Sequence, residues 1–182
     1  MSSRSSNRPR PRPKRLNSVP IERAPNGTRG TEMPGGKLLQ KVFEPLAKRH
    51  VGAYRKTGGT DRMSRMMKFP LVLLTTKGAK SGAERVVALG GFQEGEDSWL
   101  IVASKGGSKT HPAWLNNMIQ HPDDIWLEVG KRKMKVHAEA LTGAAREEAY
   151  RRVAAAAPQY SEYPKKTDRL IPVIRLTAVS GS

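Results

Sequence analysis

Hydrophobic residues between positions 37 and 56 recur at the spacing of one helix face. They are Leu38, Leu39, Val42, Phe43, Leu46, Val51 and Tyr54, and basic residues occupy other positions. Apolar side chains three and four residues apart share one face of an α-helix. The pattern therefore predicts an amphipathic helix that ends at Gly58-Gly59 and either packs on a core or lies on a membrane surface.

After a short basic linker, the apolar residues form short runs separated by turn residues. Such runs, rich in β-branched residues and bounded by glycine or polar residues, are typical of β-strands. They predict strands over residues 71–76, 85–92, 99–104, 125–129, 134–140 and 171–178, the second interrupted by Gly90-Gly91. Several neighbouring runs are joined by tight turns, which favours antiparallel hairpins.

Two further helices are predicted among these strands. A short helix is expected over residues 112–120, because proline suits the first helical position. A longer one is expected over residues 144–157, capped by Thr142 and stopped by Pro158, and residues 159–169 are expected to form a polar loop. Strands and helices do not alternate, so the pattern favours a small, mainly antiparallel α+β barrel of about six strands over a doubly wound sheet.

The first 36 residues differ in composition from the remainder. Residues 8–13 alternate arginine with proline, and serine and glycine fill much of the rest. Such a segment buries too little apolar surface to offset the entropy lost on ordering. We expect a disordered basic tail over residues 1–36 and a single folded domain over residues 37–182.

Charge and composition limit the functions that this chain can have. Residues 1–30 carry eight Arg or Lys against one acid, so the remainder keeps +10 of the total net charge of +17. The domain should attract nucleic acid, anionic lipid or a small polyanionic ligand. The chain has no cysteine, which excludes disulfides, iron–sulfur clusters and Cys-ligated zinc. With neither an apolar run of roughly 20 residues nor a signal sequence, we expect a cytoplasmic protein.

Two loops combine glycine, hydroxyl groups and lysine at the ends of predicted strands. One is Thr75–Gly82, followed by Arg85, and the other is Ala103–Lys109. Glycine lets the backbone approach an anion, turn N–H groups can surround phosphate oxygens, and lysine adds charge. Neither loop matches a P-loop, and no G-x-G-x-x-G is present. The loops are either an anion site or ordinary solvated turns.

Other candidate groups indicate little chemistry by themselves. The four histidines show no paired metal-ligand spacing, so we predict no metal site. The serines have no evident base partner, so a serine hydrolase is unsupported. Trp114 and Asn117 share a helix face and border either a ligand or the core. Tyr160 and Tyr163 either cover a pocket or pack on the barrel.

Several segments in order resemble the deazaflavin-dependent nitroreductase family. They are residues 73–82, Arg85-Val86, residues 102–107, His111-Pro112-Ala113-Trp114, Asn117, Tyr160, Tyr163, Thr167-Asp168-Arg169 and Ile171-Pro172-Val173. The resemblance covers residues 38–178, and the A-S-K-G-G segment followed by H-P-A-W is its most specific part.

The resemblance implies a split β-barrel that binds the deazaflavin cofactor F420 in a basic groove. The implied cofactor-binding residues are Lys80, Ser81, Arg85, Ser104, Lys105, Gly106, Gly107, Trp114 and Asn117. Lys80 and Arg85 would meet the phosphate and oligoglutamate tail of F420. Tyr160 and Tyr163 are the implied catalytic residues at the substrate pocket, where a tyrosine or a water would deliver a proton.

The implied activity is hydride transfer from reduced F420 to an electrophilic organic acceptor, with the cofactor carrying the chemistry. Ala79 replaces a residue that is often basic in the family, and Gly90 and Ala157 replace aromatic residues beside the substrate. A quinone or another conjugated acceptor is therefore expected in preference to nitroimidazole compounds.

Three other functions fit the same residues. They are a flavin mononucleotide enzyme, a cofactor-binding protein without turnover, and a basic nucleic-acid-binding barrel. The last would need surface aromatics between basic residues, whereas aromatics make up 5% of the chain, so we expect no specific nucleic acid. Residues 1–56 are suited to peripheral contact with an anionic membrane, and we expect a monomer or homodimer.

Overall fold

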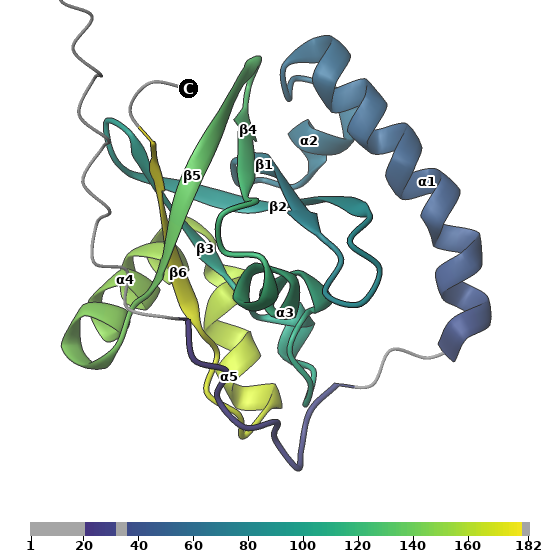
Figure 1. The fold of residues 1–182 in the computed structure, drawn as a ribbon. Helices are drawn as coiled ribbons and strands as arrows, with labels where there is room; N and C mark the ends of the chain where they lie inside the picture. Colours follow the sequence, from purple (N-terminus) through teal and green to yellow (C-terminus); the bar gives the residue numbers. More distant parts are fainter. Residues whose placement is uncertain (1–20, 32–35, 180–182) are drawn as a thin grey trace, which may run out of the picture.

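Six antiparallel strands close into one barrel in the computed structural model, which describes residues 21–31 and 36–179. The strands are β1 (Leu71–Lys77), β2 (Glu84–Gly95), β3 (Ser98–Val102), β4 (Trp126–Val129), β5 (Arg132–Ala140) and β6 (Val173–Ala178). Their order around the barrel is β1-β2-β3-β6-β5-β4 (Figure 1). The predicted α+β barrel with antiparallel hairpins is confirmed.

Helices surround the barrel on several sides. They are α1 (Gly36–Thr57), α2 (Arg62–Met66), α3 (Ala113–Gln120), α4 (Gly143–Ala156) and α5 (Tyr163–Lys166), with single 3-10 turns η1 (Lys105–Gly107) and η2 (Pro158–Glu162). In Figure 1, α1 flanks the side formed by β2, and α4 lies on the opposite side. No helix in the described part of the chain is long and apolar enough to cross a membrane.

Two segments expected to be irregular are helical, which corrects the sequence interpretation. Residues 159–169 contain η2 and α5 in place of the expected polar loop. The basic linker contains α2, whose N-cap Asp61 accepts hydrogen bonds from the backbone N–H groups of Met63 and Ser64 at 3.0 and 3.2 Å. Thr142 occupies the N-cap position of α4, but its side chain makes no capping hydrogen bond.

Strand β2 changes its partner at the two glycines that were expected to interrupt it. It pairs with β1 over Glu84–Gly90 and with β3 over Gly91–Gly95, and it is continuous through both. A Cβ at Gly91 would lie 2.5 Å from a methyl carbon of Val72, so a larger residue would collide with β1. Over Glu84–Gly90 no described strand pairs with the second edge of β2, so the closed barrel keeps one unpaired strand edge here, the open edge of β2.

The described residues bury two apolar clusters. The first fills the barrel and includes Leu74, Ile101, Leu127 and Leu176. The second lies between the barrel and α4 with η2, and it includes Leu100, Val102, Phe92, Tyr150, Val153 and Tyr160. Successive side chains of β3 point alternately into the first and the second cluster, as expected for a strand that is covered on both faces.

Residues 21–31, which belong to the segment expected to be a disordered tail, contact the folded domain. They run in extended conformation along the loop after β3, and Ile21 packs against the barrel core. The remaining parts of the expected tail, residues 1–20 and 32–35, lie outside the described residues.

The C-terminal end of α1 is attached to the barrel by Tyr54 and Arg55. The hydroxyl of Tyr54 donates to the carbonyl of Leu71 at 2.9 Å and accepts from the N–H of Gly130 at 3.0 Å. Arg55 forms a forked pair with Glu128 on β4, whose carboxylate is buried. The pair links α1 to β4, which neighbours β1 on the side away from β2.

Replacing Arg55 should therefore destabilise the protein measurably. Arg55→Ala leaves the buried carboxylate of Glu128 without its charged partner, which costs about 2 kcal/mol. For a chain of this size, that cost lowers the melting temperature by about 4–8 °C, measured by circular dichroism. Arg49→Ala, which removes an exposed cation from the same helix, is the control and should shift it by less than about 2 °C. Equal melting temperatures for both variants would contradict the assigned role.

Candidate functional site

A cavity of about 510 Å³ lies beside the open edge of β2. It is lined by the end of β1 (Thr76, Gly78), by β2 (Arg85, Val87), by η1 (Lys105) and by the start of α3 (Pro112, Ala113, Trp114, Asn117). Its volume falls within the range of pockets that bind small molecules and cofactors. Four residues expected to bind a cofactor, Arg85, Lys105, Trp114 and Asn117, thus share one cavity.

Asn117 holds the first glycine-containing turn in place. Its side-chain oxygen accepts from the N–H of Ala79 at 2.9 Å, and its NH₂ group donates to the hydroxyl of Thr76 at 3.1 Å. Asn117 is 8% exposed and both ends of its amide are paired, so its shown role is to orient the turn beside the cavity.

Gly78 makes room for polar side chains at the cavity wall. A Cβ at this position would lie 2.7 Å from the Ser81 hydroxyl oxygen and 3.7 Å from Nε of Arg85. Ser81 Oγ also accepts a hydrogen bond from the N–H of Ala83 at 3.3 Å. Lys80 is exposed in the same turn and does not line the cavity. The turn therefore brings Ser81 and Arg85 together, but not Lys80.

The second loop has a backbone that is unusual for its residue types. Lys105, Gly106 and Gly107 all have positive φ, at 45°, 63° and 81°. Glycine adopts this region freely, but lysine does so at a cost, and such strain tends to occur at functional sites. Lys105 is supported by a 2.7 Å hydrogen bond from its ammonium to the hydroxyl of Thr110. Burial and the nearby charge of Arg169 lower the pKa of Lys105, because both disfavour its charged form.

Arg169 determines the shape of this loop, and sequence reasoning did not select it as a site residue. Its guanidinium is buried and donates to the carbonyls of Ser108 at 2.7 Å, Ser104 at 2.7 Å and Ala103 at 3.0 Å. Burial lowers the pKa of Arg169. Thr167-Asp168-Arg169 was part of the resemblance, but the expected loop there offered no reason to bury an arginine.

His111 is held in one neutral form by its two neighbours. Its Nε2 lies 2.9 Å from the carbonyl oxygen of Ala24 and donates to it, since a carbonyl can only accept. Nη1 of Arg169 lies 3.4 Å from Nδ1, which is therefore the accepting nitrogen. Burial and the charge of Arg169 lower the pKa of His111. Its two hydrogen bonds connect Ala24 of residues 21–31 with Arg169, which holds the second loop.

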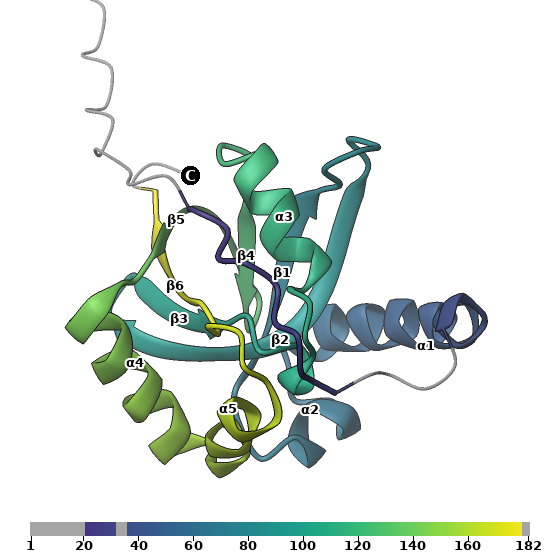
Figure 2. The same ribbon diagram turned by 90° about the horizontal axis from the view of Figure 1, so that it is seen from below.

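Residues 21–31 form a strap across the second loop, to which they are hydrogen-bonded. Figure 2 shows this segment, in purple, passing beside α3. The N–H and hydroxyl of Thr31 donate to the carbonyls of Gly107 and Gly106 at 2.9 and 2.7 Å. Asp168 accepts from the hydroxyl of Thr28 at 2.6 Å and from the N–H of Arg29 at 3.0 Å. The hydrogen bonds from the Thr28 hydroxyl and from the backbone N–H groups of Arg29 and Thr28 lower the pKa of Asp168 to about 2, so its carboxylate stays ionised at neutral pH.

The two candidate tyrosines lie in the second apolar cluster and not in the cavity. Tyr160 is 6% exposed, and its ring packs against Phe69, Phe92 and Tyr163. A Cβ at Gly90 would lie 2.6 Å from the Tyr160 hydroxyl, so this group reaches the backbone of β2. Burial raises the pKa of both tyrosines, so each keeps its proton at neutral pH. Their catalytic role stays a prediction.

A second, more polar hollow of about 540 Å³ adjoins the cavity and shares Arg85 with it. Lys48, Arg55 and Glu84 also line it, between α1 and β2. A polyanionic ligand that enters the cavity beside Arg85 can extend along this basic wall.

Comparison with known proteins identifies a family for most of the chain. Residues 46–178 match the family model described as F420H(2)-dependent quinone reductase. An F420H(2)-dependent quinone reductase of Mycobacterium tuberculosis is 34% identical over 145 residues, which covers 77% of this chain and 95% of that protein.

Two solved structures are similar in sequence and fold. One, described as an F420-H2 dependent reductase, is 41% identical, with a TM-score of 0.54, and the match covers 59% of this chain and 93% of that one. The other, described as a domain-swapped dimer, is 34% identical, with a TM-score of 0.56, and covers 75% of this chain and 98% of that one.

Loosening the strap should expose the second loop to proteolysis. In the double variant Thr28→Ala, Asp168→Ala, two of the side chains that pair residues 21–31 with the loop before β6 are removed. Local opening then becomes more frequent, so trypsin should cleave after Lys105 and Lys109 at least about five-fold faster than in wild type, measured by mass spectrometry. The variant Thr57→Ala, altered at the end of α1, is the control. Unchanged cleavage in the double variant would show that the strap does not hold the loop.

Proposed function

The chain belongs to the family of F420H(2)-dependent quinone reductases, and from this premise we propose that it binds F420 in the cavity beside β2 and transfers the hydride of the reduced cofactor to a quinone. The observation that carries the proposal is the meeting of Arg85 and Lys105, from two glycine-containing loops, in one cavity with Trp114. The net charge of +10 outside the first 30 residues supports a polyanionic cofactor.

The residues around the cavity fit the chemistry of F420. Its phosphate and carboxylates need cationic and N–H donors, and Arg85 of β2 and Lys105 of η1 supply charge to the same cavity. The ammonium of Lys105 donates to the neutral hydroxyl of Thr110, and no carboxylate among the described residues pairs with it. Burial also lowers its pKa. The hollow that shares Arg85 also contains Lys48 and Arg55 and offers a path for the oligoglutamate tail.

The protein's part in the reaction is to bind, orient and exclude water. Reduced F420, when bound, supplies a hydride, which is two electrons with one proton. Arg85 and Lys105 bind its anionic groups, Trp114 borders the cavity, and Asn117 keeps the turn at Ala79 in position. The acceptor becomes a hydroquinone after it also takes up a proton, which we assign to a tyrosine hydroxyl or a water.

Tyr160 and Tyr163 are the proposed proton-donating residues. Both keep their protons at neutral pH, and the Tyr160 hydroxyl reaches Gly90 at the open edge of β2. In the family resemblance, Gly90 and Ala157 replace aromatic residues that line the substrate side of the nitroreductase, so we propose a quinone acceptor in preference to nitroimidazole compounds.

Peripheral contact with an anionic membrane and dimer formation are further parts of the proposal. Leu46 and Met66 are 51% and 65% exposed on α1 and α2, among basic residues, which suits contact with lipid. A similar structure is described as a domain-swapped dimer, so we propose that this chain forms a homodimer. Analytical ultracentrifugation distinguishes this assembly from a monomer.

The activity is tested by mixing the full chain with reduced F420 and 2-methyl-1,4-naphthoquinone under nitrogen. We expect the fluorescence of oxidised F420 to appear in proportion to hydroquinone formed. Flavin mononucleotide, titrated in the same way as F420, should bind much more weakly. No F420 oxidation with any quinone would reject the proposed function.

Removing either cavity cation should weaken F420 binding. Arg85→Ala and Lys105→Ala each remove a charged hydrogen-bond donor, and the dissociation constant should rise roughly ten-fold or more in low salt. High salt should reduce the difference, since it screens partly exposed pairs. Lys80→Ala should have a smaller effect, because Lys80 does not line the cavity.

The control for these variants is Lys131→Ala, which removes the same charge from the turn between β4 and β5. It should bind F420 as wild type does, by fluorescence titration. If Arg85→Ala and Lys105→Ala also bind normally while remaining folded, the two loops are ordinary solvated turns.

Removing the tyrosine hydroxyls should affect turnover more than binding. In Tyr160→Phe and Tyr163→Phe, the rings still pack in the aromatic cluster but have lost the proton donor. General acid catalysis contributes about 10²–10⁴-fold, so kcat should fall by at least about ten-fold in one variant while the F420 dissociation constant changes less than about two-fold. Normal kcat in both variants would assign the proton to water.

A further inference from the structure

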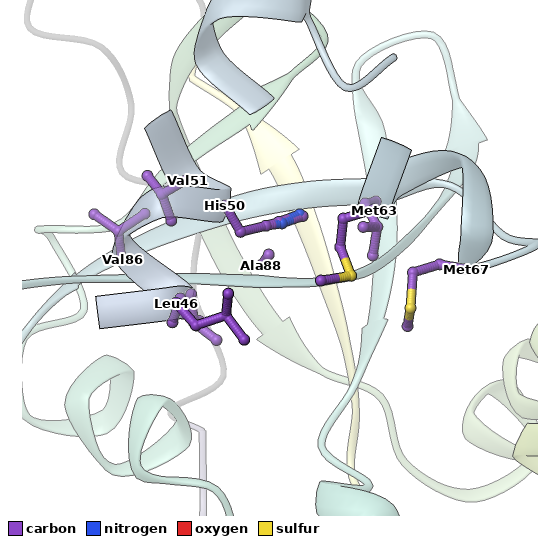
Figure 3. A pocket seen from close by; sticks show the side chains of 10 residues that line it. Leu46, His50, Val51, Met63, Met67, Val86 and Ala88 are labelled. Atoms are coloured by element: carbon purple, nitrogen blue, oxygen red, sulfur yellow. The ribbon is translucent and has the colours of Figure 1, made fainter. Parts of the chain in front are cut away.

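A third cavity, of about 340 Å³, lies between α1, α2 and the outer side of β2. It is lined by Leu46, Ala47, His50, Val51, Met63, Met67, Leu71, Val86, Val87 and Ala88. All of these side chains are apolar except His50. Figure 3 shows the imidazole of His50 directed from α1 toward Met63 of α2, beside Ala88 of β2.

The imidazole of His50 has hydrogen-bonding capacity that the described residues do not use. Both ring nitrogens are buried, and neither has a hydrogen-bond partner in the described part of the chain. A buried polar atom without a partner is costly, and ligands often supply the missing bond. A neutral imidazole offers one N–H donor and one bare nitrogen acceptor.

The third cavity adjoins the proposed cofactor cavity at a single residue. Val87 lines both, while the neighbouring Val86 and Ala88 line only the third cavity of these two. The two spaces therefore meet at the edge of β2 that has no described strand partner. Hydride transfer needs the donor and acceptor atoms within about 3–3.5 Å, so an acceptor must bind in a space adjoining the cofactor.

We propose that this third cavity binds the ring of the quinone acceptor and that His50 hydrogen-bonds to one quinone oxygen. The proposal rests on the proposed function, of which it names the acceptor site. The apolar walls match a quinone ring, and the single polar side chain matches its oxygen. The N–H of His50 donates to the carbonyl oxygen of the quinone, and its bare nitrogen accepts from the hydroxyl of the hydroquinone product.

The rim of the cavity explains how a poorly soluble acceptor enters. Leu46, Met63 and Met67 line the cavity and are also 51%, 40% and 39% exposed, so an apolar surface leads from outside to His50. A prenyl tail on the quinone can lie along this surface while the ring occupies the cavity. The flexible thioethers of the two methionines adapt to rings of different size.

The test measures quinone binding to the full chain without cofactor, by isothermal titration calorimetry. The probes are 2-methyl-1,4-naphthoquinone and 2-methylnaphthalene, which has the same ring without the two oxygens. Met63→Trp fills the cavity, and its control Met66→Trp makes the same change on the same helix at a residue that is 65% exposed and lines none of the three cavities. His50→Phe keeps the ring but removes the hydrogen bond.

We expect Met63→Trp to weaken binding of both probes about ten-fold or more, and Met66→Trp to change it less than about two-fold. His50→Phe should weaken binding of the quinone about three- to ten-fold and leave 2-methylnaphthalene unaffected, because only the quinone has the oxygen. F420 affinity should be normal in every variant. In turnover with reduced F420, Met63→Trp and His50→Phe should raise the quinone KM by similar factors.

The proposal would be overturned if Met63→Trp and His50→Phe are folded and have the same quinone affinity and quinone KM as wild type. Equal loss of both probes in His50→Phe would overturn the role of the hydrogen bond. These results are distinct from failure of the proposed function, which is absence of F420 oxidation by quinones in the wild-type chain. Cofactor-free binding that depends on Met63 and His50 would support the site even then.

Discussion

The buried guanidinium of Arg169 is the interaction on which the candidate site depends. It has no described carboxylate partner and instead donates to the carbonyls of Ala103, Ser104 and Ser108. A buried charge must be fully hydrogen-bonded, so the chain between residues 103 and 108 cannot relax without exposing or unpairing it. This constraint supports the left-handed backbone of Lys105, which a free loop would abandon. The loop therefore offers its lysine in a fixed position.

Preorganisation extends from Arg169 to both walls of the cavity. The strap of residues 21–31 binds the carbonyls of Gly106 and Gly107 from one side, and Asp168, next to Arg169, anchors that strap. On the opposite wall, the amide of Asn117 holds the turn after β1. A site whose loops are already ordered loses less conformational entropy when a ligand binds. Residues from distant parts of the chain thus hold the two loops that line this cavity.

The open edge of β2 gives the site two different kinds of surface. Over Glu84–Gly90 the strand has β1 on one side only, because its pairing passes to β3 at Gly91. Residues of this stretch take part in all three cavities, and Val87 lines both the apolar cavity and the proposed cofactor cavity. Arg85 lines the two cavities that contain cationic side chains, Ala88 lines only the apolar one between α1, α2 and β2, and Val86 lines the apolar cavity and the more polar hollow. One strand thus contributes to both the proposed cofactor cavity and the proposed acceptor cavity.

Local pattern was sufficient to predict most of the elements and the identity of the two loops. Short apolar runs bounded by turn residues identified all six strands, since these signals depend on residues that are neighbours in the sequence. The same pattern missed α2, which is short and has Asp61 as its main signal, and it mistook η2 and α5 for a loop. Charge and glycine placed Arg85 and Lys105 in a candidate anion site, but their convergence in one cavity required the pairing of β1 with β2 and the fold of η1.

What only the tertiary structure decided are the contacts between residues far apart in the chain. Sequence composition made residues 1–36 look unable to order, yet residues 21–31 are ordered by Asp168 and by the carbonyls of the second loop, about 75–140 positions away. Arg169 looked like a solvated loop residue because nothing near it in sequence predicts the carbonyls that bury it. Likewise, the ring nitrogens of His50 are buried without a hydrogen-bond partner among the described residues because α2 and β2 enclose that side chain. The sequence by itself determined which elements form and which charges they carry, because these depend on neighbouring residues. The tertiary structure decided which side chains meet, because burial and hydrogen bonding depend on the whole fold.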